Sequence, residues 1–141
     1  MAHLVSSVFV KRSQRDNVVV LRVHGDLDLC YAPGVAVEAA EEIRAGHDLI
    51  IDIATVGFMD SAGIAMLLNA CRRATRADVG FAIVCPGGTA RRSIEIARLV
   101  DTLNVCPDHR TATARVTTLP APTTRPSRPS LTLVDGGATL R

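Results

Sequence analysis

The first 116 residues alternate between short apolar runs and longer stretches in which apolar residues recur every three or four positions. The apolar runs are rich in aliphatic residues and bounded by turn residues, which predicts buried strands. A looser alternation over residues 6–12, followed by a polar turn at residues 13–17, predicts an antiparallel hairpin with the first of these runs. The strands expected from the runs are residues 18–23, 49–53 and 81–85, with a short last strand at 104–106.

The stretches between these strands have helical spacing. The first helix is expected to begin near Pro33, where a missing N–H is tolerated, and to end at Gly46, which can take a positive φ. The second covers residues 61–75, the third has Thr89 as its N-cap, and a weak fourth covers 107–115. The expected core-facing residues are Ala36, Ala39, Ala40, Ile43, Ile64, Leu67, Leu68, Cys71, Ile94 and Ala97, with Val100 or Ile96. The expected solvent-facing residues of the first helix are Glu38, Glu41, Glu42 and Arg44.

This order of elements predicts an α/β fold with a mixed β-sheet packed by helices, parallel in its middle and carrying an antiparallel hairpin at one edge. Beyond about residue 116 the composition changes, and residues 117–129 contain four of the seven prolines. Such a segment cannot bury enough apolar surface to offset its chain entropy. We therefore expect one domain over residues 1–116 and a disordered Pro/Thr/Arg-rich tail over residues 117–141.

The charge distribution gives no reason to expect a nucleic-acid partner. Residues 1–106 carry 11 Lys or Arg and 12 Asp or Glu, so the formal net charge of +2 arises from the five Arg and two Asp of residues 107–141. Only four aromatic residues occur and there is no Trp, which leaves few platforms for base stacking. A domain without a basic surface or stacking platforms is not expected to bind nucleic acid directly.

The cysteines and the apolar stretches exclude further classes of protein. Cys30, Cys71, Cys85 and Cys106 are scattered, with no C-x-x-C and no His at ligand spacing. We expect them to act as small buried hydrophobes in a reducing compartment, with no metal site and no cofactor. The N-terminus lacks a signal pattern, and no stretch approaches the ~20 apolar residues that span a bilayer. The expected protein is cytoplasmic and does not bind a membrane.

The segment of residues 57–63 carries the most distinctive chemistry. A buried strand is followed by a tight loop, and Asp60 or Ser61 stands at the N-cap of the next helix. Unpaired N–H groups and the positive end of the helix dipole favour an anion there. Ser61 is therefore either a capping residue or a phosphate acceptor, whose added charge would repel a partner. A nucleophilic serine is disfavoured, because G-x-S-x-G is missing and His24 and His47 belong to other elements.

Asp26 and Asp28 form a second polar cluster at the end of the second hairpin strand. They are either loop acids that cap the following helix or, if this strand pairs in parallel with residues 49–53, a cluster in which Asp28 lies near Ser61. On the helix after Ser61, the outward residues are expected to be Ala65, Asn69, Arg72, Arg73 and Arg76. This face is either simply solvated or a docking surface for an acidic partner.

These segments resemble the STAS domain, in particular the small bacterial anti-anti-sigma factors, also named anti-sigma factor antagonists. The resemblance covers roughly residues 8–115 and implies a small mixed sheet packed by helices in a protein that is not an enzyme. Three departures are that Gly-Asp-Leu-Asp replaces Gly-Glu-Leu-Asp, that Ala62 replaces a second serine, and that Cys30 and Tyr31 replace Thr or Ala. The matching residues are Gly25-Asp26-Leu27-Asp28-Leu29, Ala32-Pro33, Leu49-Ile50-Ile51-Asp52-Ile53 and Phe58-Met59-Asp60-Ser61-Ala62-Gly63-Ile64.

The resemblance implies a phosphorylation switch at Ser61. An anti-sigma factor, itself a serine kinase of the histidine-kinase-like ATPase type, would phosphorylate Ser61, and a PP2C-type phosphatase would remove the phosphate. The unphosphorylated protein would bind the anti-sigma factor and release a sigma factor. Asp28 matches the acidic residue beside the phosphate acceptor. The expected partner-binding residues are Asp26, Asp28, Asp60, Ser61, Ala62, Gly63, Ala65, Asn69 and Arg72.

Two alternatives remain open at this point. A STAS-like domain also serves as a scaffold or as a ligand-sensing regulatory module in a signalling assembly, without a phosphorylation switch. A serine hydrolase ranks third, because no His is convincingly placed. Phosphate transfer from ATP to Ser61 by an anti-sigma kinase would separate these interpretations.

Overall fold

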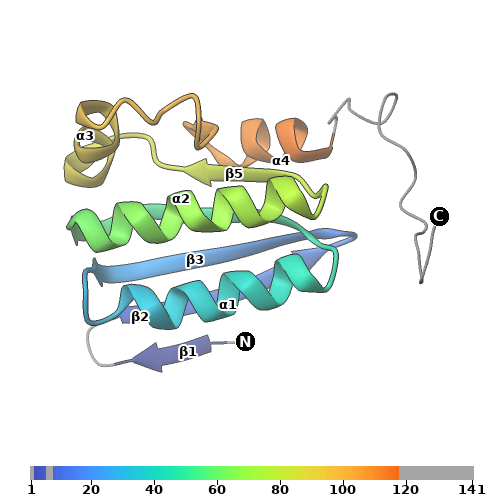
Figure 1. The fold of residues 1–141 in the computed structure, drawn as a ribbon, viewed down its shortest axis with the longest axis horizontal. Helices are drawn as coiled ribbons and strands as arrows, with labels where there is room; N and C mark the ends of the chain where they lie inside the picture. Colours follow the sequence, from blue (N-terminus) through green and yellow to red (C-terminus); the bar gives the residue numbers. More distant parts are fainter. Residues whose placement is uncertain (1, 6–7, 118–141) are drawn as a thin grey trace.

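The computed structural model describes residues 2–5 and 8–117 and shows a β-sheet covered by helices (Figure 1). Within these residues, six strands form one sheet in the order β1-β2-β3-β4-β5-β6. β1, β2 and β3 pair antiparallel, and β3 to β6 pair in parallel. The predicted mixed sheet is confirmed, and β1 is an additional strand. The strands are β1 Ala2–Val5, β2 Val8–Arg15, β3 Val18–Leu27, β4 Asp48–Met59, β5 Phe81–Val84 and β6 Val105–Cys106.

Helices cover both faces of the sheet. The helices are α1 Ala32–Arg44, α2 Ser61–Arg76, α3 Gly88–Ile96 and α4 His109–Thr117. α1 and α2 lie side by side over one face (Figure 1). Leu49 and Ile51 of β4 join the core under α1 and α2, whereas Ile50 joins a second cluster with Ala112 and Val116 of α4. β4 is therefore buried on both faces and forms the middle of the fold.

β4 is longer than the sequence predicted. The sequence pattern placed a loop before Asp60, but the strand continues to Met59 because these residues pair with β3. The pairing extends from Thr55 opposite His24 to Met59 opposite Leu27, with one register shift just before it and one within it, between Gly25 and Asp26. As a result, a single residue separates β4 from α2.

The predicted turns are found, one of them shorter than expected. The polar turn at residues 13–17 contracts to Asp16 and Asn17, because Arg15 already pairs with Val18 in the hairpin. Asp16 has a φ of 55°, which an Asp tolerates better than most residues. Gly46 follows α1 with a φ of 87°, as predicted for a residue that ends a helix.

Glu42 is the clearest departure in α1. Expected to face solvent, it is only 9% exposed. Arg12 of β2 donates from Nε to Glu42 Oε2 at 2.5 Å, and His47 Nδ1 lies 2.9 Å from Glu42 Oε1. The hydrogen bond from Arg12 lowers the pKa of the Glu42 carboxyl and raises the pKa of the Arg12 guanidinium. Glu41 and Arg44 are exposed, as predicted.

α2 buries a face shifted from the predicted one. The small residues Gly63, Ala70 and Ala74 let the helix approach its neighbours closely, so larger side chains fill its flanks. The buried residues are Gly63, Met66, Leu67, Ala70 and Ala74, and Ile64, Leu68 and Cys71 are half-buried beside them.

α3 differs from the prediction at both ends. Its N-cap is Gly87 rather than Thr89. It ends at Ile96, because Arg98 takes a left-handed φ of 59°, and this leaves Ala97 exposed and Ile96 76% exposed. The inner side chains are Ala90 and Ile94, with Val100 packed beyond the helix end.

α4 begins later than the predicted range of 107–115. Asp108 precedes it and accepts a hydrogen bond from the N–H of Thr111 at 2.8 Å, which lowers the pKa of the Asp108 carboxyl. The helix runs to Thr117, and the rest of the expected tail lies outside the described residues. Among the described residues, no helix combines the length and the apolar character needed to cross a membrane.

Candidate functional site at the start of helix α2

Asp60 joins the two segments that the sequence analysis singled out. It is the N-cap of α2, and its Oδ1 accepts hydrogen bonds from the N–H of Ala62 at 2.9 Å and of Gly63 at 3.2 Å. Its Oδ2 accepts a third hydrogen bond from the N–H of Leu29 at 3.1 Å. The choice between Asp60 and Ser61 as N-cap is settled for Asp60, and one carboxylate ties the loop after β3 to the first turn of α2.

Gly63 allows α2 to approach the end of β3. A Cβ atom at this position would lie 2.4 Å from the carbonyl oxygen of Leu27 and 2.6 Å from Cγ of Met59. The first contact is with backbone, which cannot move aside as a flexible side chain does, so a larger residue would displace the helix. Gly63 therefore serves the site by packing, and its closeness to β3 explains the glycine of the Asp-Ser-Ala-Gly segment.

Asp28 follows β3 directly and organises the entry to α1. Its Oδ1 accepts hydrogen bonds from the N–H of Cys30 at 3.0 Å and of Tyr31 at 3.2 Å. These bonds form a turn before α1, whose N-cap is Tyr31 with no side-chain hydrogen bond, so the prediction that Asp28 caps the helix is wrong. The parallel pairing of β3 with β4 is present as well, and it brings the loop of Asp28 to the cap of α2 through the bond between Leu29 and Asp60.

Asp26 lies on β3, opposite Phe58 of β4. A Cβ atom on Gly57 would lie 3.8 Å from Asp26 Oδ1, so this carboxylate lies against the glycine. Asp26 and Asp28 flank the buried Leu27. Together with Asp60, these two acids give the carboxyl ends of β3 and β4 a negative character.

Ser61 is the first residue of α2 and is exposed. In the part of the chain that the structure describes, its side chain makes no hydrogen bond, so the hydroxyl faces outward unengaged. The N–H groups of Ala62 and Gly63 are already bonded to Asp60. A phosphate on Ser61 would therefore add its charge beside an existing carboxylate instead of taking over the helix cap.

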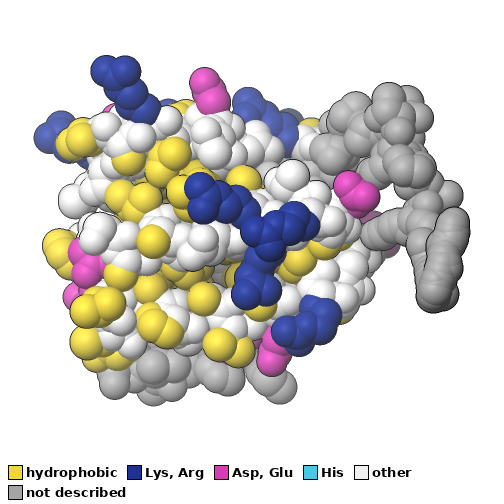
Figure 2. All heavy atoms as spheres, in the orientation of Figure 1, with side chains coloured by type: hydrophobic (Ala, Val, Ile, Leu, Met, Phe, Trp, Pro, Cys, Tyr) yellow, Lys and Arg dark blue, Asp and Glu magenta, His cyan; other side chains and the backbone are white. Residues whose placement is uncertain are grey.

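Two exposed hydrophobic side chains occur in the segments next to the cap of α2: Leu29 in the loop after β3, and Phe58 near the end of β4 on the sheet face opposite the core-facing Met59. Leu29 is 71% exposed and Phe58 is 49% exposed. Figure 2 shows hydrophobic side chains gathered at the end of the molecule where α1 and α2 begin. Exposed apolar side chains with polar neighbours are typical of a protein-binding surface. Neither residue was predicted to bind a partner, because their exposure depends on the extended β4 and on the course of the loop after β3.

The outward face of α2 continues from Ser61 toward the other end of the molecule. Its first half carries small or uncharged residues, and its second half carries arginines; Figure 2 shows Lys and Arg side chains over this half. The predicted outward positions are all exposed: Ala65, Asn69, Arg72, Arg73 and Arg76.

The cysteines, and the acids away from Ser61, do not form a metal site in the described residues. Across residues 2–5 and 8–117, no three His, Cys, Asp or Glu residues are grouped to hold a metal ion. Cys85 and Cys106 are buried, and burial raises the pKa of both thiols, which keeps them protonated. The prediction that all four cysteines are buried is wrong for Cys30, which is exposed and free, and Cys71 is only half-buried.

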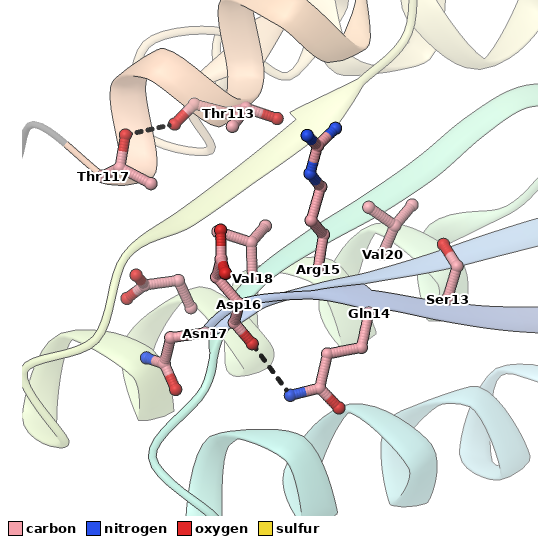
Figure 3. A pocket seen from close by; sticks show the side chains of 10 residues that line it. Ser13, Gln14, Arg15, Asp16, Asn17, Val18, Val20, Thr113 and Thr117 are labelled. Carbon is pink, nitrogen blue, oxygen red and sulfur yellow. Dashed lines mark hydrogen bonds between the residues drawn. The ribbon is translucent and has the colours of Figure 1, made fainter.

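A cavity of about 620 Å³ lies at the opposite end of the sheet, between the β2–β3 turn and α4 (Figure 3). Its polar groups serve the local structure. Gln14 donates from Nε2 to the carbonyl oxygen of Asp16 at 3.0 Å, and Thr117 donates from Oγ1 to the carbonyl oxygen of Thr113 at 2.8 Å. This cavity is separate from the surface around Ser61.

Comparison with known proteins points to one family. The sequence matches the STAS domain over residues 10–112. No curated protein sequence matches this chain. The crystal structure of an anti-sigma factor antagonist from Mycobacterium paratuberculosis is similar, with 26% identity and a TM-score of 0.73, over 79% of this chain and 95% of that chain.

The fold is also that of SpoIIAA, an anti-sigma factor antagonist. Its unphosphorylated form has 20% identity and a TM-score of 0.66, over 78% of this chain and 97% of that chain. The structure of the Bacillus cell fate determinant SpoIIAA in its phosphorylated form has 21% identity and a TM-score of 0.60, over 76% of this chain and 98% of that chain.

Proposed function

This chain belongs to the STAS domain family, and we propose that it acts as an anti-sigma factor antagonist controlled by phosphorylation of Ser61. The observation that carries the proposal is the exposed Ser61 at the start of α2, next to a cap that ties the loop after β3 to the first turn of the helix. In the unphosphorylated form the chain binds an anti-sigma factor, which is also its serine kinase, and a sigma factor is released. A PP2C-type phosphatase restores the hydroxyl. The similarity to anti-sigma factor antagonists supports this role.

The binding surface surrounds Ser61. Asp60 holds the loop after β3 against α2, so Leu29 is presented together with the serine. Burial of the Leu29 side chain supplies the apolar part of the contact. The polar and small residues of the surface are Asp26, Asp28, Asp60, Ala62, Gly63, Ala65, Asn69 and Arg72.

Phosphorylation acts through charge. A phosphate adds about −1.5 to −2 charge at pH 7. This charge lies near Asp26, Asp28 and Asp60, which already make the rim of the sheet, at the carboxyl ends of β3 and β4, negative. A partner that covers Ser61 would have to remove this charge from water, which opposes binding. The fold is not disturbed, because Asp60 keeps its bonds to the helix and Gly63 keeps its contact with β3.

Incubation of the full chain with a cognate anti-sigma kinase and ATP tests the proposal. Mass spectrometry should find phosphate on Ser61 and none on the Ser61→Ala variant. Ser61→Asp should reduce partner affinity at least tenfold, which corresponds to about 1.4 kcal/mol. Its circular dichroism spectrum should remain that of the native chain.

Thr113→Asp is the matched control, because Thr113 is exposed on α4, on the other face of the sheet. It should bind like the unmodified chain. If no such kinase places phosphate on Ser61 and the partner binds Ser61→Asp as well as wild type, the phosphorylation switch is wrong. A scaffold or ligand-sensing role would then take its place.

A further inference from the structure

The outward face of α2 is divided into an uncharged half and a basic half. At about 100° per residue, Ser61, Ala65, Asn69, Arg72 and Arg76 fall on one stripe of the helix. The stripe begins with a hydroxyl, continues with small or neutral side chains and ends with guanidinium groups. α2 contains no Asp or Glu, so no acid on the helix offsets these charges.

The arginines on this stripe differ from those that stabilise the fold. Arg12, Arg22 and Arg91 each form an ion pair with an acid of the same chain. Arg72 and Arg76 are exposed, and among the described residues no hydrogen bond or ion pair engages their guanidinium groups. The helix dipole stabilises a cation in the last turn, which accounts for Arg76 better than for Arg72, one turn earlier.

We propose that Arg72 and Arg76 bind an acidic segment of the anti-sigma factor, while Leu29 binds its apolar residues. The inference rests on the proposed function and names the chemistry of the partner: carboxylates at the basic half of the stripe, apolar side chains at the Ser61 end. Guanidinium groups suit this role, because they pair with carboxylates in a bidentate way. The basic half thereby fixes the direction in which the partner lies along α2.

The two ends of the stripe act independently. Ser61 and Arg72 are eleven residues apart, or about 16 Å along the helix axis. This exceeds the Debye length of about 8 Å at physiological salt, so the arginines do not neutralise a phosphate on Ser61. The arginines attract the partner during encounter, whereas the Ser61 end determines how long the complex lasts.

Binding kinetics of the full chain with the anti-sigma kinase that phosphorylates it test this division. The double variant Arg72→Glu, Arg76→Glu should lower the association rate constant about tenfold at low ionic strength and flatten its salt dependence. Ser61→Asp should raise the dissociation rate constant and leave the association rate constant near that of wild type. Arg110→Glu, on α4 on the other sheet face, is the matched control for the single variant Arg72→Glu and should bind like wild type.

Association of the double variant at the wild-type rate would overturn the proposal, as would an equal loss in Arg110→Glu. These outcomes leave the phosphorylation switch intact if Ser61→Asp still dissociates faster. A short poly-glutamate peptide provides a probe that does not depend on the partner. On addition of the peptide, the amide resonances of the protein that shift in NMR spectra should lie in the second half of α2, and these shifts should be lost in the double variant. Shifts centred instead on the arginines of α3 would contradict the proposed site.

Discussion

The acids at the rim of the sheet and the acids in its interior are satisfied in different ways. At the rim, Asp28 and Asp60 accept hydrogen bonds from backbone N–H groups. In the interior, Asp52 and Glu42 each pair with an arginine and a histidine. Backbone N–H groups are neutral, so the rim acids keep their negative charge, whereas the interior acids are compensated. The negative charge of the rim acids is thus available to interact with a partner, whereas the charge of the interior acids is neutralised by side chains of the same chain and stabilises the fold.

Asp52 shows how far the interior pairing extends. It is 5% exposed, and its Oδ2 lies 2.5 Å from Nε2 of His109 and 3.3 Å from Nε of Arg22. Its Oδ1 accepts a hydrogen bond from the N–H of Ala54 at 2.9 Å. One buried carboxylate therefore connects β3, β4 and the first residue of α4.

The largest expected effect comes from breaking this interior group. Asp52→Ala should lower the free energy of unfolding by about 2 kcal/mol, because it removes three hydrogen bonds, whereas the partner side chains Arg22 and His109 are partly exposed and can be solvated. Urea denaturation measures the loss, and Asp101→Ala, an exposed acid, should stay within about 0.5 kcal/mol of wild type. Equal stability of the two variants would show that the interior pairing contributes nothing.

A smaller effect is expected at the rim. Asp60→Ala should cost about 1–2 kcal/mol by removing the cap of α2 and the bond to Leu29, and it should weaken partner binding. Asp60→Asn, which retains a capping oxygen, should recover most of the stability. Thermal denaturation compares them with Ser61→Ala, which should unfold like wild type; a comparable loss in Ser61→Ala would mean that the serine shares the capping role.

The smallest effect is a pH dependence at Glu42. Because Arg12 lowers the pKa of this carboxyl in the folded chain, its stabilisation is fully present above the ordinary value of 4.5 and is lost as the pH falls below it. At pH 7, Glu42→Gln should be less stable by about 1 kcal/mol, the scale of one charge-assisted hydrogen bond after screening. Urea titrations should show this difference shrinking as the pH falls from 4.5, with exposed Glu41→Gln as control. A constant difference would exclude the linkage.

The periodicity of apolar residues was enough to predict most of the fold, because strands and helices here keep one face in the core. It also predicted the exposed face of α2, where the arginines fall at positions that helical spacing turns outward. The Asp60-Ser61 segment was located for the same reason, since capping chemistry is local. The proximity of Asp28 and Asp60 depended on parallel pairing of β3 and β4, which the order of elements already favoured.

What the sequence did not reveal depends on partners distant along the chain. Glu42 sits where α1 alone predicts a solvent-facing residue, and its arginine comes from β2, thirty residues earlier. Asp52 looked like one polar residue in an aliphatic run, and His109 reaches it from α4, 57 residues later. The extension of β4 to Met59 follows from pairing with β3, because the residues involved are partly exposed and have no strict alternation.

The helical position of Ser61 has a consequence for the enzyme that would modify it. The serine lies in the first turn of α2, and Asp60 and Gly63 hold that turn against the end of β3. A kinase that reads an extended peptide could not use this backbone as it stands. The proposed kinase must therefore recognise a folded epitope, and the surface that selects the partner is also the surface that selects the substrate. Changes that loosen the cap would thus impair phosphorylation and binding together.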